Sequence, residues 1–264
     1  MRKMFIVLLA LFLMVGFSAN NALADRTDVK KGVKIKYKEG SVSGGGAIAG
    51  KVVFKGAKPA HSEIVKEKNP EVCGTGVRII DPWTLGSGGE LLDAVVYIAD
   101  IKSGKAWPST KFKFDQKGCA FVPYISVMKN KAKVEVVNLD PVGHNIHTYE
   151  YRGNIKLSKL DGTTQTILNV GQPDQGFTFA KKIRVKKDPQ MKMECDIHNF
   201  MHGWMMVLSN PYYSMTKADG SFKIDNVPAG TYKVVAWHPT FGTTEQKVTV
   251  SGGASQSASF ELKL

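Results

Sequence analysis

The sequence predicts an all-β protein built from two sandwiches, and three observations support this prediction. Short runs rich in β-branched and aromatic residues recur along the chain, separated by Gly, Pro, Asn and Asp. No segment keeps an apolar period of 3.6 residues, and only Ser62–Asn69 is a candidate helical turn. Roughly 240 residues remain after an N-terminal targeting segment, which is enough for two modest domains with separate cores.

The expected strands are defined by alternating apolar and polar residues or by β-rich runs. In chain order the clearest are Ala47–Phe54, Ala94–Ile98, Phe121–Val127, Lys133–Asn138, Phe177–Val185, Trp204–Leu208, Tyr232–Trp237 and Gln246–Val250. Alternation along a strand turns one face toward a core and the other toward solvent. Many short strands with frequent turns are typical of β-sandwiches.

Residues 1–24 have the features of a secretory signal peptide. Arg2 and Lys3 precede an apolar stretch from Met4 to Phe17, and Ala22-Leu23-Ala24 matches a small-residue cleavage site. The apolar stretch is too short for a stable membrane span. We therefore expect an exported mature chain, in a bacterium periplasmic, with no transmembrane segment after signal removal.

Basic residues gather in two places and contribute to a formal net charge of +13. Residues 25–45 form an expected flexible tail, with Lys30, Lys31, Lys34, Lys36 and Lys38. In the run Lys181–Lys187, the side chains of Lys182, Arg184 and Lys186 share one face of a strand. Such a run is most often a solvated face; the alternative is that it steers the protein toward an acidic redox partner. Nucleic acid is not expected, because the basic stretches lack interleaved aromatic residues.

The C-terminal stretch carries two turn signals. Asp219-Gly220 is typical of a tight hairpin, and Pro228-Ala-Gly230 precedes the alternating strand Tyr232–Trp237. This stretch resembles the second half of a carboxypeptidase regulatory-like domain, which is a transthyretin-type β-sandwich. Segments that resemble its first half, Ile48–Gly56 and Leu92–Ile98, lie much earlier in the chain.

This order predicts a split domain. Residues 46–108 and 209–264 would fold together, and residues 109–208 would form a second sandwich inserted between them. Insertion is tolerated where the two ends of the inserted domain leave from one surface loop. A tandem arrangement, with the second sandwich next to the first, is the alternative.

The chemistry-bearing motif is Cys195-x-x-His198-x-x-Met201, with His144 and His147 upstream. Two imidazoles and a thiolate in a trigonal plane, with a weak axial thioether, form a blue copper site. Soft sulfur ligands suit Cu(I), whereas imidazoles accept both oxidation states. The motif therefore predicts one copper ion that cycles between Cu(I) and Cu(II).

The spacing of this motif, together with Gly-His144-Asn145-Ile-His147, resembles the amicyanin and plastocyanin type of cupredoxin, or type 1 blue copper, domain. The resemblance implies a Greek-key sandwich over residues 109–208. It also implies that His144, Cys195 and His198 are the equatorial ligands and Met201 the axial one. His144 and His147 point to opposite faces of a strand, so only one enters the site.

The resemblance further implies that Asn145 hydrogen-bonds the ligand loop and so helps to orient the ligands. Asn199 departs from the pattern, because amicyanin has a proline after the loop histidine. If Cys195 is a ligand, Cys73 and Cys119 are left over, and two such cysteines commonly form a disulfide in an oxidising compartment. A buried free thiol, or Cys119 in a metal site, is the alternative.

Four further residues near the motif have two interpretations. Met191 and Met193 either fill the core, as methionine usually does, or form a Cu(I)-loading patch. His202 is expected to be a surface histidine, with gating of electron entry as an alternative. His147 is expected to face solvent or to support the ligands from outside the site, and either histidine could bind a second ion. Of Met205 and Met206, at least one is expected in the core.

No enzyme constellation is evident, since the sequence lacks a nucleophile elbow, a phosphate loop and paired carboxylates in a strand-end setting. The expected function is a non-enzymatic one-electron carrier that exchanges electrons with a partner protein such as a cytochrome or a dehydrogenase. The alternatives are a periplasmic copper carrier or sensor, and a cell-envelope binding module with a structural metal site.

Overall fold

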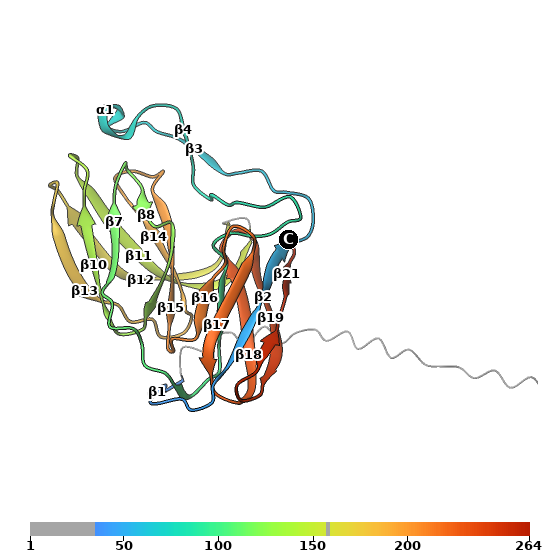
Figure 1. The fold of residues 1–264 in the computed structure, drawn as a ribbon. Helices are drawn as coiled ribbons and strands as arrows, with labels where there is room; N and C mark the ends of the chain where they lie inside the picture. The colour runs from blue at the N-terminus through green and yellow to red at the C-terminus, as the bar shows by residue number, and fades with distance from the viewer. Residues whose placement is uncertain (1–34, 157–158) are drawn as a thin grey trace, which may run out of the picture.

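The structure, a computed structural model, describes residues 35–156 and 159–264 and is almost entirely β, as predicted. Its strands form two neighbouring sandwiches (Figure 1). The predicted signal peptide and the first part of the predicted basic tail lie outside the described residues. Among the residues that are described, no helix has both the length and the apolar character needed to span a membrane.

The central sandwich consists of a four-stranded sheet in the order β13-β10-β7-β8 and a five-stranded sheet in the order β12-β11-β14-β15-β9. Its strands are β7 (Phe112–Gln116), β8 (Phe121–Val122), β9 (Ile125–Lys129), β10 (Lys133–Asn138), β11 (His144–Lys156), β12 (Lys159–Gln172), β13 (Thr178–Lys182), β14 (Gln190–Glu194) and β15 (His202–Leu208). The pairs β10·β7 and β15·β9 are parallel, and the other pairs are antiparallel.

The outer sandwich contains the sheets β16-β5-β18-β19 and β17-β2-β20, and β21 also pairs with β2. Its strands are β2 (Gly46–Phe54), β5 (Val95–Ile98), β16 (Tyr213–Met215), β17 (Ser221–Val227), β18 (Gly230–His238), β19 (Gly242–Val250), β20 (Ser255–Ser257) and β21 (Phe260–Leu262). β2 and β5 precede the central sandwich in the chain, whereas their partners β17 and β18 follow it. Strands that come before the central sandwich in the chain therefore pair with strands that come after it, within the same sheets.

Local sequence explains the strands of the outer sandwich. In β17, Phe222 and Ile224 are buried and Lys223 and Asp225 are exposed, which is the period of two expected for a strand with one face on a core. Gly220 precedes β17 with φ of +71°, the left-handed conformation that its hairpin turn requires. Gly50 in β2 allows the backbone at Ala258 to approach closely. A Cβ at this position would lie 1.9 Å from the carbonyl oxygen of Ala258 and would clash with it.

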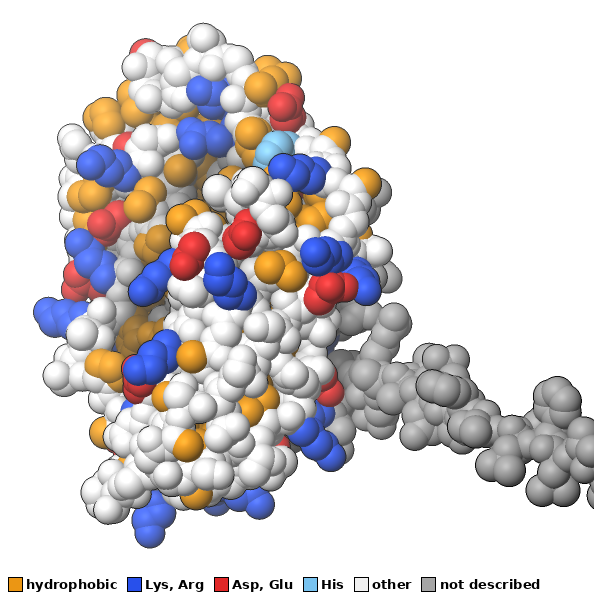
Figure 2. Space-filling model, turned by 45° about the vertical axis from the view of Figure 1, so that its right-hand side comes forward, with side chains coloured by type: hydrophobic (Ala, Val, Ile, Leu, Met, Phe, Trp, Pro, Cys, Tyr) orange, Lys and Arg blue, Asp and Glu red, His pale blue; other side chains and the backbone are white. Residues whose placement is uncertain are grey.

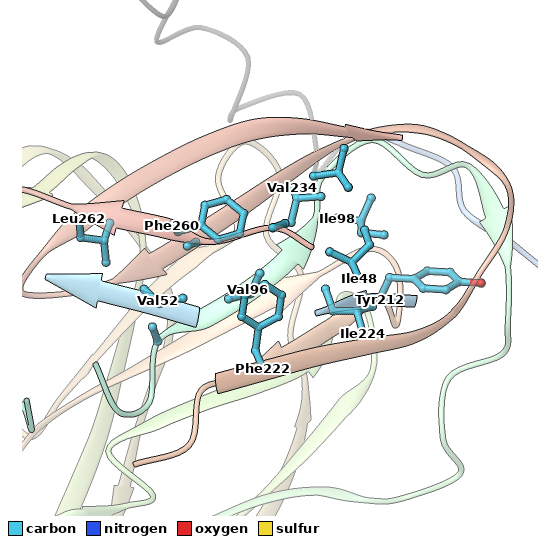
Figure 3. Close-up of a cluster of buried hydrophobic side chains, with 14 of the residues drawn as sticks. Ile48, Val52, Val96, Ile98, Tyr212, Phe222, Ile224, Val234, Phe260 and Leu262 are labelled. Atoms are coloured by element: carbon cyan, nitrogen blue, oxygen red, sulfur yellow. The ribbon is translucent and has the colours of Figure 1, made fainter. Parts of the chain in front are cut away.

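Three clusters of buried side chains hold the molecule together. The first fills the outer sandwich and includes Ile48, Val96 and Phe260 (Figure 3). The second fills the central sandwich. The third joins the two sandwiches, and in it the rings of Trp204 from β15 and Trp237 from β18 lie 6.1 Å apart, edge to face.

The segment between β2 and β5 leaves the outer sandwich. It contains β3 (Glu63–Val65) paired with β4 (Val77–Ile79), and the single-turn helix α1 (Pro70–Cys73) between them. The prediction of a helical turn at Ser62–Asn69 was therefore wrong. Pairing with β4 makes the start of that stretch a strand, and the helical turn begins one residue after it, at Pro70, a residue well suited to a first helical position. The remaining short pair is β1 (Lys38–Glu39) with β6 (Ser103–Gly104), which run parallel.

Charged side chains are mixed on the face shown in Figure 2, where basic and acidic groups lie side by side. In the basic run that follows β13, Arg184 and Lys186 are exposed while Ile183 and Val185 are buried. This is the alternation expected from the sequence, although β13 itself ends at Lys182. A role of the run in steering a partner stays a prediction.

Candidate metal centre

Three strands bring the predicted ligands to one end of the central sandwich. His144 is the first residue of β11, Cys195 follows the last residue of β14, and His198 lies in the loop that leads to β15. β11 and β14 are antiparallel neighbours in which His147 faces Glu194. The start of one strand and the end of the other therefore lie side by side, which places His144 next to the Cys195 loop.

The ligand atoms converge on one point. Nδ1 of His144 lies 3.0 Å from Nδ1 of His198, and Sγ of Cys195 lies 3.8 Å from the same His198 nitrogen. One ligand atom from each residue lies within 4.8 Å of the other two. The three residues are at most 2% exposed, so the arrangement belongs to the interior and not to the surface.

The ligand loop is closed by its own backbone. The N–H of Cys195 donates to the carbonyl of Met201 at 3.2 Å, and the N–H of Met201 donates to the carbonyl of His198 at 2.9 Å. Met201 is 1% exposed and belongs to the central core. These bonds give the loop a compact shape, with the predicted axial residue at its far end.

Two backbone N–H groups point at the sulfur of Cys195. They come from Asn145 and His198, each 3.4 Å away. Burial raises the pKa of the Cys195 thiol, while these N–H donors act in the opposite direction because they stabilise a thiolate. Burial is the larger effect, so the buried sulfur would need a nearby cation, such as a metal ion, to hold a negative charge.

The remote nitrogens of both imidazoles have oxygen partners. Nε2 of His144 lies 2.9 Å from Oδ2 of Asp140, and Nε2 of His198 lies 2.9 Å from Oδ1 of Asn69. An oxygen acceptor at Nε2 favours the tautomer whose lone pair is on Nδ1. Two such lone pairs facing each other at 3.0 Å repel unless a cation or a shared proton lies between them. The donor set of two imidazoles and a thiolate therefore fits a metal ion, and copper in particular.

Electrostatics disfavour protonation of His198. Burial, followed by the neighbouring His144, lowers the pKa of His198 to about 4. A metal ligand must be neutral imidazole. His198 is therefore available for a metal at neutral pH.

Asn145 ties the ligand loop to β11. Its amide oxygen accepts from the N–H of Asp196, and its amide nitrogen donates to Oδ2 of Asp196 and to Oδ1 of Asn169, both at 2.9 Å. His147 lies away from the three converging residues, with Nδ1 3.0 Å from Oδ1 of Asp196. Burial acts to raise the pKa of Asp196, but hydrogen bonds from His147, Asn145 and Asn169 outweigh it, and the pKa is lowered.

The neighbouring methionines and His202 are not arranged as a second site. Met191 and Met193 are fully buried in the central core, so they form no exposed Cu(I)-loading patch. Met205 lies in the same core and Met206 in the cluster between the sandwiches. His202 donates through Nε2 to the carbonyl of Asn199 at 2.8 Å, and burial lowers its pKa.

The predicted disulfide is confirmed. Cys73 is bonded to Cys119, with their Cα atoms 5.3 Å apart, and Cys195 is the free cysteine. Cys119 is thereby unavailable as a metal ligand, although it lies close to Asp140 and His144.

Sequence reasoning missed Asn69 and Asp140. Asp140 also accepts from the N–H groups of Gly118 and Cys119, at 2.7 and 2.8 Å. The only local signal is that each precedes a proline, in Asn69-Pro70 and Asp140-Pro141. An X-Pro pair predicts a turn, but it does not indicate which imidazole the side chain will meet.

Comparison with known proteins gives two kinds of match. The model of the carboxypeptidase regulatory-like domain family matches residues 207–263. A purple cupredoxin from Nitrosopumilus maritimus aligns with 37% of this chain and 99% of its own, at 16% identity and a TM-score of 0.29. A reduced Cu(I) form of an amicyanin mutant aligns with 38% of this chain and 84% of its own, at 15% identity and a TM-score of 0.27.

A Cu-containing nitrite reductase from Thermus scotoductus aligns over 43% of this chain but only 25% of its own, at 16% identity and a TM-score of 0.29. No curated protein matches the sequence. The chain thus carries a carboxypeptidase regulatory-like match at residues 207–263, and its structural neighbours are cupredoxins, the two resemblances predicted from the sequence.

Proposed function

We propose that this chain is an exported mononuclear copper protein that carries single electrons between redox partners. The observation that supports this most is the convergence of Nδ1 of His144, Nδ1 of His198 and Sγ of Cys195. Nitrogen and sulfur ligands bind a metal at about 2.0 and 2.3 Å, so ligands of one ion lie roughly 3 to 4 Å apart. A His₂Cys plane with an axial methionine, here Met201, is typical of electron-transfer copper sites.

Copper would supply the one-electron couple, and the residues around it would keep the ligands still. Asp140 and Asn69 hold the remote nitrogens of the two imidazoles, and the closed loop holds Cys195. Ligands that keep their positions in both oxidation states lower the reorganisation that accompanies electron transfer. With Met201 as the fourth ligand no open coordination position remains, unlike in catalytic metal sites, which keep one.

A partner would dock where apolar side chains reach the surface near the ligand loop. Ile197, between Cys195 and His198, is 39% exposed, and Leu139, next to Asp140, is 37% exposed. A cytochrome or a dehydrogenase bound there would have its own cofactor close to the copper. The basic run Lys181–Lys187 would steer an acidic partner toward the protein.

We also infer the domain division from strand pairing. Residues 46–108 and 209–264 form one domain with residues 109–208 inserted, because β2 and β5 pair with β17 and β18. Cleavage of the signal peptide after Ala24 is part of the same proposal, and N-terminal sequencing of the exported protein tests it. A copper carrier or sensor is less favoured, because Met191 and Met193 have no exposed surface.

The test is a titration of the apoprotein with Cu(II), followed by visible absorption and paramagnetic resonance. One equivalent is expected to give an intense colour from thiolate-to-copper charge transfer, and Cys195→Ser is expected to abolish it. His147→Ala is the matched control, because His147 lies outside the converging ligands and its loss should leave the colour unchanged. A colourless Cu(II) adduct of the unmutated protein would contradict the proposal.

A further inference from the structure

We propose that residues 61–81, here called the clasp, form a fastened cover over the metal centre, and that Asn69 is the positioning residue through which the clasp orients His198. This inference rests on the proposed function, because it assigns a role toward the same ion. The clasp contains β3, α1 and β4. It leaves the outer sandwich and reaches past one end of the central sandwich (Figure 1).

The clasp is closed at its base and packed against the central sandwich. The backbone N–H and the hydroxyl of Ser62 both bond to the carboxylate of Asp81, at 2.7 and 3.0 Å, so its two ends are held together. Ile64, Val72 and Ile80 pack against the core of the central sandwich. The clasp is therefore docked by apolar contact and does not depend on the metal for its position.

Three further links fasten the clasp to residues 118–124. The disulfide joins Cys73 to Cys119, Arg78 donates to the carbonyl of Gly118 at 2.9 Å, and the hydroxyl of Tyr124 donates to the carbonyl of Ile80 at 3.1 Å. Two of the three partners, Gly118 and Cys119, also donate through their N–H groups to Asp140 and so lie next to the site. The fastening therefore positions α1 over the ligand loop.

Asn69 is arranged to present an oxygen to the site. Its φ of 51° is left-handed, and its backbone carbonyl, not its side chain, accepts from the N–H groups of the first helical turn. The side chain is thereby free to reach the site. Its amide nitrogen donates to Oε1 of Glu71 at 3.1 Å, and its oxygen meets Nε2 of His198 at 2.9 Å. Glu71 thus orients the amide so that the oxygen, and not the nitrogen, faces the imidazole.

Two consequences follow for His198. The Asn69 oxygen holds the proton on Nε2 and keeps the Nδ1 lone pair directed at the metal. The ring also cannot turn away from the metal without breaking this bond. In addition, His198 is 0% exposed, and Asn69 of the clasp contacts its outer nitrogen.

The disulfide supports the other imidazole as well. The N–H of Cys119 donates to the Asp140 oxygen that meets Nε2 of His144. The disulfide is thus close to the hydrogen-bond partners of both histidines. Cys73 ends α1, which begins next to Asn69, and Cys119 donates to Asp140. The clasp is therefore expected to have two effects: it slows the loss of the metal, and it keeps the two histidines in position.

The first experiment uses the apoprotein and a matched pair of variants. Asn69→Gly removes the acceptor and tolerates a left-handed backbone. Asn69→Asp gives up the hydrogen bond to Glu71 but keeps an acceptor oxygen for Nε2 of His198, and it also adopts this conformation readily. ¹⁵N–¹H correlation spectra report the tautomer of His198. The Nε2–H form is expected in the unmutated protein and in Asn69→Asp, and a mixture of tautomers with faster Nε2–H exchange is expected in Asn69→Gly.

The second experiment measures copper loss from the loaded proteins to an excess of a Cu(I) chelator. Loss of an outer hydrogen-bond partner typically lowers metal affinity by about 10- to 100-fold, and this range is expected for Asn69→Gly, with Asn69→Asp close to the unmutated protein. The double variant Cys73→Ala/Cys119→Ala should also release copper faster. Because this double variant loses a cross-link that stabilises the fold, the Asn69 pair, with the disulfide intact, decides the result.

The two proposals can fail separately. If Asn69→Gly keeps both the Nε2–H tautomer and the unmutated rate of copper loss, the clasp proposal is overturned while the copper function stands. If the tautomers change as expected but no variant gives a coloured Cu(II) complex, the contact between Asn69 and His198 is supported and the proposed function fails.

Discussion

The two sandwiches of this molecule bury different kinds of side chain. The cluster inside the outer sandwich is apolar, and nearby buried polar residues such as Thr216 and Asn210 bond mainly to backbone groups. At one end of the central sandwich, by contrast, His144, His198 and Cys195 are buried with their reactive atoms directed at one another. Burying polar groups is costly unless they find partners. The comparison teaches that, among the described residues, buried polar groups that converge on one point lie at the end of the central sandwich, which is where a metal ion would be their partner.

The two sandwiches are nevertheless one packed unit. Trp237 of the outer sandwich donates through Nε1 to Oε1 of Gln190 in the central sandwich at 2.7 Å, and its ring meets Trp204. The largest expected effect therefore concerns this shared interface. Trp237→Ala is expected to lower the free energy of unfolding by about 3–5 kcal/mol.

Denaturant unfolding of the copper-loaded protein, followed by visible absorption for the central sandwich and by circular dichroism for the whole molecule, measures this effect. Both signals should shift to lower denaturant concentration. Val122→Ala, at a position that is 47% exposed, is the control and should change stability by less than about 0.5 kcal/mol. An unchanged midpoint for the copper signal would show that the sandwiches unfold independently.

Acid is expected to destabilise the outer sandwich through His238. Burial lowers the pKa of His238 to about 3, and Nδ1 accepts from the N–H of Thr240 at 3.1 Å. The unfolded chain binds this proton near pH 6.5 and the folded chain does not, so stability falls as the pH decreases from about 6.5 to 3. The full contribution is about 5 kcal/mol. Unfolding measured at several pH values should show a shallower decline in His238→Asn, whose oxygen replaces Nδ1 as acceptor; identical declines would contradict the assignment.

A matched pair of core substitutions separates stability from metal binding. Ile48 of the outer sandwich and Ile146 of β11 are both fully buried. Replacing either by Ala should cost about 2–5 kcal/mol. Only Ile146→Ala should alter the visible spectrum of the copper protein, because it follows His144 and Asn145 on the same strand. If Ile48→Ala changes the visible spectrum as much as Ile146→Ala does, the claim that only the central sandwich holds the metal site in place is contradicted.

The smallest expected effect concerns Asp140, which supports His144. Asp140→Asn keeps an acceptor oxygen but removes the negative charge, and it should weaken copper binding by about tenfold, or about 1.4 kcal/mol. Chelator competition measures this change. In the outer sandwich, Thr216→Val removes hydrogen bonds to backbone groups of Leu91 and Ala94. This control should lower the free energy of unfolding by about 1–3 kcal/mol and leave copper affinity unchanged. Weaker copper binding in Thr216→Val with unchanged binding in Asp140→Asn would contradict the contrast between the two sandwiches.

The clearest sequence signal for the candidate site came from residues that lie close together in the chain. Cys195, His198 and Met201 share one short loop, so their spacing alone indicates the chemistry. The disulfide between Cys73 and Cys119 followed from counting cysteines and from the expected compartment. The all-β fold followed from short β-rich runs separated by frequent turn residues, a pattern that leaves no room for long helices.

The parts that depend on packing could not be predicted. Asn69 is 129 residues from His198, and their contact exists only because the clasp docks on the central sandwich. The sequence placed His144 and His147 on a strand, but the length of that strand, β11, and its pairing with β12 were missed. β12 is rich in Thr, Gln and Asn, without the apolar alternation that marks a strand with one face on a core.

The order of the strands along the chain has a consequence for how the molecule forms. β2 is synthesised early, but its partners β17, β20 and β21 begin only at Ser221. The central sandwich has all of its strands once Leu208 has been made. This chain order lets the central sandwich complete its hydrogen bonding before the outer one. β2 lacks its sheet partners until the last fifty or so residues are available, a long-range pairing of the kind that makes folding slow.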